Sequence, residues 1–171
     1  QYGVAPWSDR HFALLAENFR LLARVNNALL IVPVLLGSEF ANGSDSPVIF
    51  IKRADGSWGC DLSRVEKYLD TAIAAGCVPR IVNIVIFNDP FYGAAEKKGR
   101  ILVRDEASGK TEGMELPPPS DPQTRKILEP MARGILGALG KRGLEKAACW
   151  GHPWDALGDE MFAMAKPVSY T

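Results

Sequence analysis

The sequence lacks several features that mark large classes of proteins. Its 171 residues carry 20 basic and 20 acidic side chains, and this balance excludes the strongly positive surface of a general nucleic-acid-binding protein. No apolar run approaches the roughly 20 residues that a membrane-spanning helix needs, so we expect no membrane span. The first residues also lack a charged stretch followed by an apolar stretch, so no signal peptide is in view, unless one has already been removed.

Cysteine and histidine are scarce as well. Cys60, Cys77 and Cys149 form no CxxC pair and have no histidine at a ligand spacing, which argues against a structural zinc site. Cys77 and Cys149 lie beside apolar runs, a position typical of buried and inert thiols. We therefore expect no metal and no other cofactor.

The common nucleotide-binding and hydrolase motifs are also missing. The four glycines from Gly134 to Gly143 do not form GxGxxG, and Gly140-Lys141 is followed by arginine instead of serine or threonine. No serine lies in a GxSxG elbow. Small residues for close helix packing explain the glycines better than a phosphate site.

What the sequence does contain is an alternation of two hydrophobic patterns. Helical spacing predicts helices that begin at Ser8 and Asp121, each of which is a suitable N-cap, and two more over 62–75 and 157–165. Short apolar runs predict strands at 28–36, 80–87 and 147–150. A β-hairpin inserted at about 99–119 separates the second strand from the next helix.

This order predicts one α/β domain over residues 1–171, with a parallel sheet and right-handed crossovers. Strands without alternation are typical of a sheet buried on both faces. Pro33 lies within the first run and lacks a backbone N–H, so we expect this residue at a sheet edge or a bulge. Residues 48–52 form a further short apolar segment, followed by a turn at 54–57.

Ligands of parallel α/β proteins bind at the carboxyl ends of the strands, and this rule selects three loops here. Each loop carries at least one carboxylate, together with amide, histidine or aromatic side chains. The candidate residues are Glu39 and Asn42 after the first strand, Asn88, Asp89 and Tyr92 after the second, and Trp150, His152, Trp154 and Asp155 at the end of the third.

These residue types fit a carbohydrate site. Two carboxylates about 5–9.5 Å apart are the usual machinery for cleaving a glycosidic bond, and aromatic faces pack against the apolar faces of sugar rings. We assign catalysis to Asp89, with Glu39 or Asp155 as its partner, and substrate binding to the other candidates. Structural roles stay open: Glu39 as a solvated loop acid, Asp89 before Pro90 as a turn residue, and Asp155 as a helix cap.

Several phrases of the sequence resemble those of a known bacterial family. They are WSDRHFALLAEN at 7–18, the strand IVPVLL, FIKRADGSWGCDLSRVEKYLD at 50–70, and the hairpin ending in MELPPP. They resemble large glycoside-hydrolase-like proteins of planctomycete-type bacteria that are distantly related to glycoside hydrolase family 123. The resemblance implies a (β/α)8 barrel of which this chain is a central section, since a complete barrel takes about 250 residues.

The resemblance also implies an activity. Characterised relatives remove N-acetylgalactosamine with retention, and an adjacent Asp-Glu pair at a strand end assists the acetamido group and acts as acid and base. Here only Asp89 matches, because no glutamate follows it. We therefore expect a glycoside hydrolase acting on a glycan, in an extracellular or periplasmic location, or a non-catalytic carbohydrate-binding or structural subunit. Missing barrel segments or a partner chain would cover the open sheet edges; a smaller open sheet is the other possibility.

Overall fold

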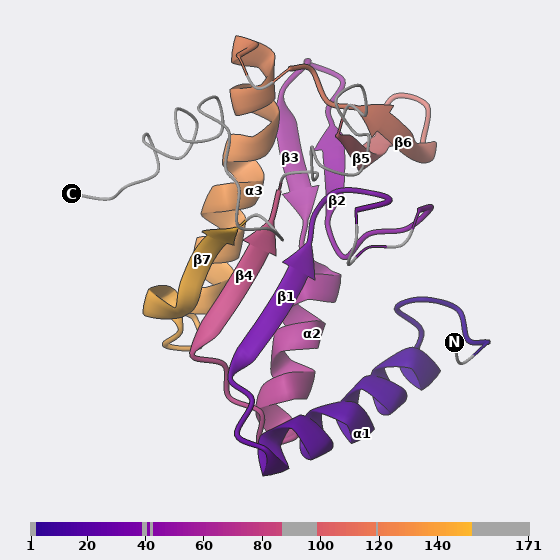
Figure 1. Ribbon diagram of the computed structural model, residues 1–171. Coiled ribbons are helices and arrows are strands. Elements are labelled where there is room, and N and C mark those ends of the chain that lie inside the picture. The colour runs from indigo at the N-terminus through magenta and orange to yellow at the C-terminus, as the bar shows by residue number, and fades with distance from the viewer. Residues whose placement is uncertain (1–2, 39–40, 42, 87–98, 119, 152–171) are drawn as a thin grey trace.

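The computed structural model describes residues 3–38, 41, 43–86, 99–118 and 120–151 (Figure 1). Helices and strands alternate along these ranges. The elements are α1 (Asp9–Arg24), β1 (Leu29–Pro33), β2 (Ile49–Lys52), β3 (Trp58–Asp61), α2 (Ser63–Ala74), β4 (Ile81–Val85), β5 (Arg100–Asp105), β6 (Thr111–Glu115), α3 (Pro122–Gly140), a 3-10 turn (Glu145–Ala147) and β7 (Ala148–Gly151). None of the helices in these ranges is long and apolar enough to cross a membrane.

Two sheets organise the chain. The first is parallel, with the strand order β1-β4-β7, and Figure 1 shows its three arrows side by side and pointing the same way. The second has the order β3-β2-β5-β6, in which only β2 and β5 are parallel. A mixed α/β fold with a parallel sheet is therefore confirmed. In the described ranges neither sheet closes on itself, and the helix predicted over 157–165 lies outside them.

The second sheet is built from two hairpins, of which only one was predicted. The hairpin of β5 and β6 confirms the insertion expected at 99–119. The short apolar segment at 48–52 also forms a hairpin, because Trp58–Asp61 pairs with it as β3. Strand β3 was missed because its four residues, WGCD, are short and include a glycine and an aspartate. The chain thus repeats one unit, a parallel strand followed by a hairpin and a helix.

The helix starts predicted at Ser8 and Asp121 are confirmed by capping hydrogen bonds. Ser8 caps α1, and its Oγ accepts a hydrogen bond from the His11 N–H at 3.2 Å. Asp121 caps α3 and accepts from the Gln123 N–H at 2.8 Å. Before α2, the Oδ1 of Asp61 accepts a hydrogen bond from the N–H of Ser63 at 3.0 Å, so this side chain partners one of the free N–H groups at the start of the helix.

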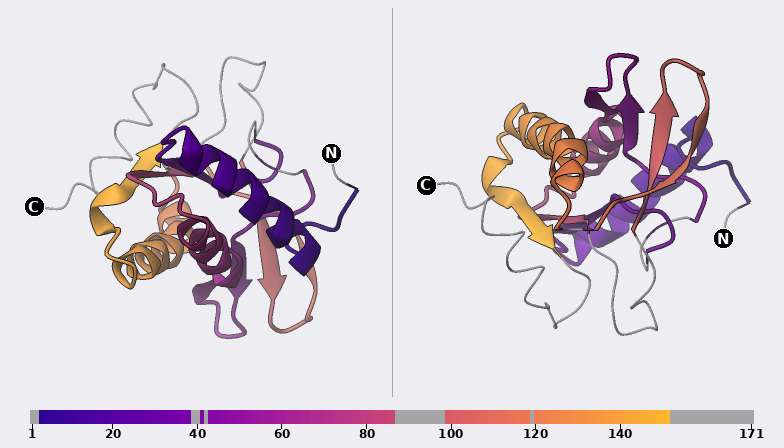
Figure 2. Two further views of the ribbon diagram at one scale, coloured as in Figure 1. Left: turned by 90° about the horizontal axis from the view of Figure 1, so that it is seen from below. Right: turned by 90° about the horizontal axis from the view of Figure 1, so that it is seen from above.

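One face of the parallel sheet packs against α2 and α3, and Figure 2 shows both helices on the same side of it. Leu30, Val32, Val82 and Ile84 point into this core and are almost fully buried. Among the described residues, burial alternates along β1 and from Ile81 to Ile84 of β4, whereas Val85 at the end of β4 is fully buried. The expected burial on both faces is therefore not met at Leu29 and Ile81. On the second face the side chains of Leu29 and Ile81 are 43% and 48% exposed, because no described element packs on them.

Pro33 lies at the last position of β1, which is an edge strand of this sheet, as predicted. Its missing N–H faces away from any described partner strand, and the next residue continues the ladder. The N–H of Val34 donates to the carbonyl of Val85 at 3.0 Å. The proline therefore sits where it removes no hydrogen bond from the sheet interior.

Candidate functional site

The carboxyl ends of the three parallel strands meet at one edge of the sheet. Pro33 pairs with Val85, which in turn pairs with Gly151, so the last residues of the three strands lie side by side. The sequence predicts this juxtaposition, because the carboxyl ends of parallel strands lie at the same edge of a sheet. The predicted site residues themselves, apart from Trp150, lie outside the described residues: Glu39, Asn42, Asn88, Asp89, Tyr92, His152, Trp154 and Asp155.

The chain that leaves β1 is firmly anchored before it reaches Glu39. Val34 to Leu36 are buried, and the N–H of Leu36 donates to the carbonyl of Arg100 at 2.7 Å, which ties this segment to the second sheet. The fully buried Ser46 holds the returning end of the loop, because its Oγ donates to the Val34 carbonyl at 3.2 Å. Both ends of this loop are therefore fixed by the core.

Trp150 is partly buried and packs against the main hydrophobic core. It pairs with Ile84, a fully buried residue on the helix-covered face. Since directly paired residues share a face of a sheet, the indole lies on the side of α2 and α3. This placement gives Trp150 a packing role, and its predicted contact with a sugar stays a prediction.

A polar residue that the sequence reasoning overlooked lies on the other face. Asn83 is the central residue of β4, and its Oδ1 is buried with no hydrogen-bond partner among the described residues. It pairs with Ile31 and Cys149. The signal was present in the sequence, because Asn83 is the one polar residue within the strand phrase IVNIVIF.

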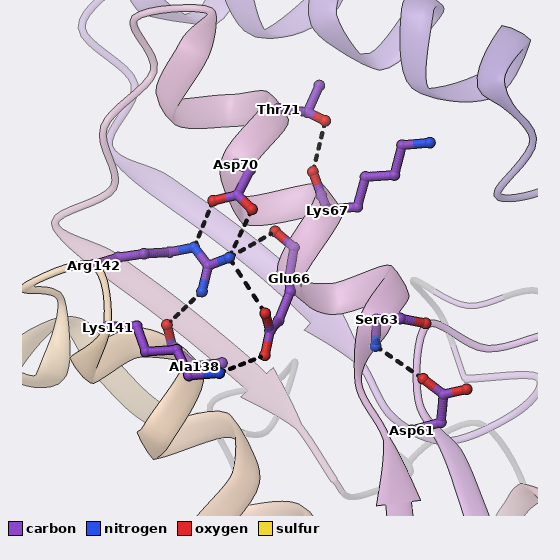
Figure 3. A network of polar contacts seen from close by, with 9 residues as sticks. All are labelled: Asp61, Ser63, Glu66, Lys67, Asp70, Thr71, Ala138, Lys141 and Arg142. Atoms are coloured by element: carbon purple, nitrogen blue, oxygen red, sulfur yellow. Dashed lines mark hydrogen bonds and ion pairs between the residues drawn. The ribbon is translucent and has the colours of Figure 1, made fainter.

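Another polar cluster joins α2 to α3 away from this edge (Figure 3). The Nε and Nη2 of Arg142 each donate to one carboxylate oxygen of Asp70 at 2.7 Å, and Lys141 bonds Glu66 at 3.3 Å. The hydrogen bonds from Arg142, together with its charge, lower the pKa of Asp70. Each acid has a basic partner, so the cluster is best explained as a clamp between two helices. Among the described residues no group of side chains could hold a metal ion.

The thiols divide into two kinds. Cys77 is buried, as predicted, and burial raises the pKa of both Cys77 and the partly buried Cys60. A raised thiol pKa disfavours the reactive thiolate. The prediction for Cys149 was wrong, because this thiol is exposed. Strand β7 is an edge strand, and Cys149 lies on the face that no described element covers.

These features define an α/β protein whose three parallel strands end side by side at one edge of their sheet. Residues 1–161 match the family model of the glycoside hydrolase 123 catalytic domain, and the chain belongs to this family. Among solved structures it is similar to a family 123 glycoside hydrolase from Clostridium perfringens, studied for glycolipid glycan hydrolysis, with a TM-score of 0.69 and 16% identity. The match covers 93% of this chain and 27% of that one. No curated protein matches the chain.

Proposed function

We propose that the protein hydrolyses glycosidic bonds at the carboxyl edge of its parallel sheet. The match of residues 1–161 to a glycoside hydrolase catalytic domain carries this proposal. The strand order supports it, because β1, β4 and β7 are neighbours and their loops leave the sheet together. Those loops contain the carboxylates that glycoside cleavage requires.

In this proposal Asp89 is the main catalytic carboxylate, and Glu39 or Asp155 is its partner. His152, Asn88 and Asn42 bind sugar hydroxyls, and Trp154 and Tyr92 supply the apolar contact surface. The strands that carry these loops are adjacent in the sheet. Carboxylates carried by adjacent strands suit a pair that acts on one glycosidic bond, one as the acid and the other as the nucleophile or base.

We further propose that the chain acts as a section of a (β/α)8 barrel. The exposed face and the two edge strands of the parallel sheet support this, as does the match to only 27% of the Clostridium perfringens hydrolase. Further barrel strands, from the same protein or a partner chain, would pair with β1 and β7. Closing the sheet would bury Leu29 and Ile81, which are half exposed here.

The test is a hydrolysis screen of the intact protein. The probes are 4-nitrophenyl glycosides of common hexoses and N-acetylhexosamines, and a glycolipid glycan. We expect turnover of at least one probe, and we expect Asp89→Asn to lower kcat by about 10²–10⁴-fold, the usual contribution of a positioned acid or base. Unchanged turnover in Asp89→Asn would contradict the assignment of Asp89.

Asp105→Asn is the matched control. Asp105 ends β5 and its Oδ1 accepts hydrogen bonds from the N–H and the Oγ of Ser108 at 2.9 and 3.1 Å, so it closes the hairpin turn. These hydrogen bonds lower the pKa of Asp105. We expect this variant to keep wild-type turnover, which separates the loss of a catalytic carboxylate from the general effect of removing a charge.

A non-catalytic role is the alternative, and one observation favours it. Asp89 is followed by Pro90, where the resemblance leads us to expect a glutamate. A protein that kept the sheet and lost its acid would bind a glycan without cleaving it. Saturable binding of a probe, measured by calorimetry in the absence of turnover, would support this alternative over hydrolysis.

A further inference from the structure

Asn83 is placed unlike the other central residues of the parallel sheet. Its neighbours in β4, Val82 and Ile84, are fully buried and point toward the helices. Asn83 points the opposite way, onto the face that no described element covers, because successive residues of a strand alternate between faces. An asparagine at the centre of a strand is unfavourable in itself, since asparagine is depleted in strands.

The side chain carries an unmet hydrogen-bonding requirement. Its Oδ1 is buried and accepts no hydrogen bond in the structure, even though the residue as a whole keeps some exposure. A buried polar atom without a partner destabilises a folded protein, because it gave up its hydrogen bonds to water. Such an atom calls for a partner that the described residues do not supply.

The backbone beside Asn83 is shaped to hold the amide in this position. Asn83 pairs with Cys149, and its amide lies across the next residue of β7 on the same face, Gly151. A Cβ at Gly151 would overlap the amide, with Oδ1 the atom closest to it. The amide therefore leans toward the carboxyl edge of the sheet, and it can do so only because residue 151 is a glycine.

We propose that Asn83 is a substrate-binding residue whose Oδ1 accepts a hydrogen bond from an O–H or N–H group of the bound sugar. The direction of the side chain places this acceptor beside the edge where the three loops leave the sheet. The inference deepens the proposed function and rests on it. It adds a residue within a strand to a site that the sequence places only on loops.

The experiment compares Asn83→Leu with Asn27→Leu in the intact protein. Asn27 lies before β1 at the opposite edge of the sheet, and its Oδ1 accepts from the Leu29 N–H at 3.0 Å, so it has a structural partner. For each variant we measure the Tm without sugar, and the kcat/KM on the 4-nitrophenyl glycoside that the wild type hydrolyses fastest. Leucine keeps the branched side-chain skeleton of asparagine, with the same number of heavy atoms, and replaces the hydrogen-bonding oxygen and nitrogen with methyl groups.

We expect the two variants to change in opposite ways. Asn83→Leu should raise the Tm by about 2–4 °C, since it removes an unmet acceptor. It should also lower kcat/KM by about 10- to 100-fold, because the sugar group is left unpaired. Asn27→Leu should lower the Tm and leave kcat/KM unchanged. Gly151→Ala is the second variant, and by displacing the amide it should lower kcat/KM as well.

Other outcomes would overturn the proposal in distinguishable ways. A lower Tm for Asn83→Leu would show that Oδ1 already serves the fold. Unchanged kcat/KM in both Asn83→Leu and Gly151→Ala, with an active wild type, would refute the role of Asn83 and leave the proposed hydrolysis intact. A wild type that neither cleaves nor binds any probe would refute the proposed function together with this inference.

Discussion

The two faces of the parallel sheet differ in what they contribute. The face toward α2 and α3 is apolar, closely packed and nearly free of exposure, with Leu30, Val32 and Ile84 at its centre. The opposite face exposes large parts of Leu29 and Ile81 and carries Asn83 with its unpaired oxygen. The first face holds the fold together, and on the second the buried Oδ1 of Asn83 has no partner among the described residues. Closely packed and unsatisfied side chains are thus separated by the thickness of one sheet.

The largest expected effect tests this separation within a single strand. Ile84→Ala should lower the free energy of unfolding by about 2–5 kcal/mol, because it leaves a cavity in the packed core. Ile81→Ala, three residues earlier and 48% exposed, should cost only about 0.5 kcal/mol. Denaturant unfolding of both variants measures the difference. A comparable loss in Ile81→Ala would show that another part of the intact protein covers this face.

A second comparison concerns two glycines of α3. A Cβ at Gly134 would lie 2.7 Å from the Cδ1 of Leu62 and 3.3 Å from the Sγ of Cys60, whereas Gly137 has open space around it. Gly137→Ala should stabilise the protein, because alanine favours helix over glycine by about 1 kcal/mol. Gly134→Ala should be less stable than Gly137→Ala by about 1–3 kcal/mol, since α3 packs too closely there. Thermal unfolding of Gly134→Ala and Gly137→Ala measures this difference in stability. Equal Tm values of the two variants would contradict the close packing at Gly134.

The clamp between α2 and α3 gives a smaller, pH-dependent effect. The pKa of Asp70 is lowered, chiefly by its hydrogen bonds from Arg142. The ionised Asp70 carboxylate therefore stabilises the folded state fully above the ordinary aspartate pKa of about 3.9. This stabilisation is lost as the pH falls through the lower pKa that Asp70 has in the folded state. Near neutral pH we expect Asp70→Asn to lose about 1 kcal/mol or less, as for other exposed ion pairs. The Tm gap between wild type and variant should shrink toward pH 2, and a constant gap would contradict a role for the charge.

The effect expected to be smallest at neutral pH concerns Tyr68 of α2, whose ring packs against Phe19 of α1 at a centroid distance of 5.2 Å. Burial raises the pKa of Tyr68 to about 12. The unfolded chain ionises near pH 10, so this tyrosine favours folding below pH 10 and loses that contribution as the pH rises through about 12. Tyr68→Phe should weaken the alkaline loss of stability. Tyrosinate absorbance of the folded wild type and variant, titrated from pH 9 to 12, should differ only near the upper end.

The sequence predicts elements whose causes are local. The caps at Ser8 and Asp121, the three apolar strands and the hairpin after β4 each depend on a few neighbouring residues, and the structure confirms them. Strand β3 was missed because its stability comes from pairing with β2, which four residues of mixed polarity do not reveal. The exposure of Ile81 was missed for a related reason, since an apolar run does not tell which of its faces has a covering partner.

The candidate site was likewise predicted only in part. The sequence correctly predicts that the carboxyl ends of three parallel strands lie side by side, because β1, β4 and β7 are adjacent; the loops that follow lie largely outside the described residues. The rule for parallel sheets draws attention to loops only, and so it passes over Asn83 within a strand. The roles of Asp89, Glu39 and Asp155 stay predictions, which the hydrolysis screen addresses.

The parallel pairing of the two hairpins has a consequence for the order of folding. Strand β2 joins β5 from Ile49 to Leu102, and the chain between them contains all of α2 and β4. Closing such a long loop costs entropy that is recovered only after the intervening elements have packed. Each hairpin needs contacts between neighbouring residues only, whereas the parallel pairings of β1 with β4, β2 with β5 and β4 with β7 each close a long loop. On this argument we expect the pairing of β2 with β5, like the other parallel pairings, to form after the local hairpin contacts.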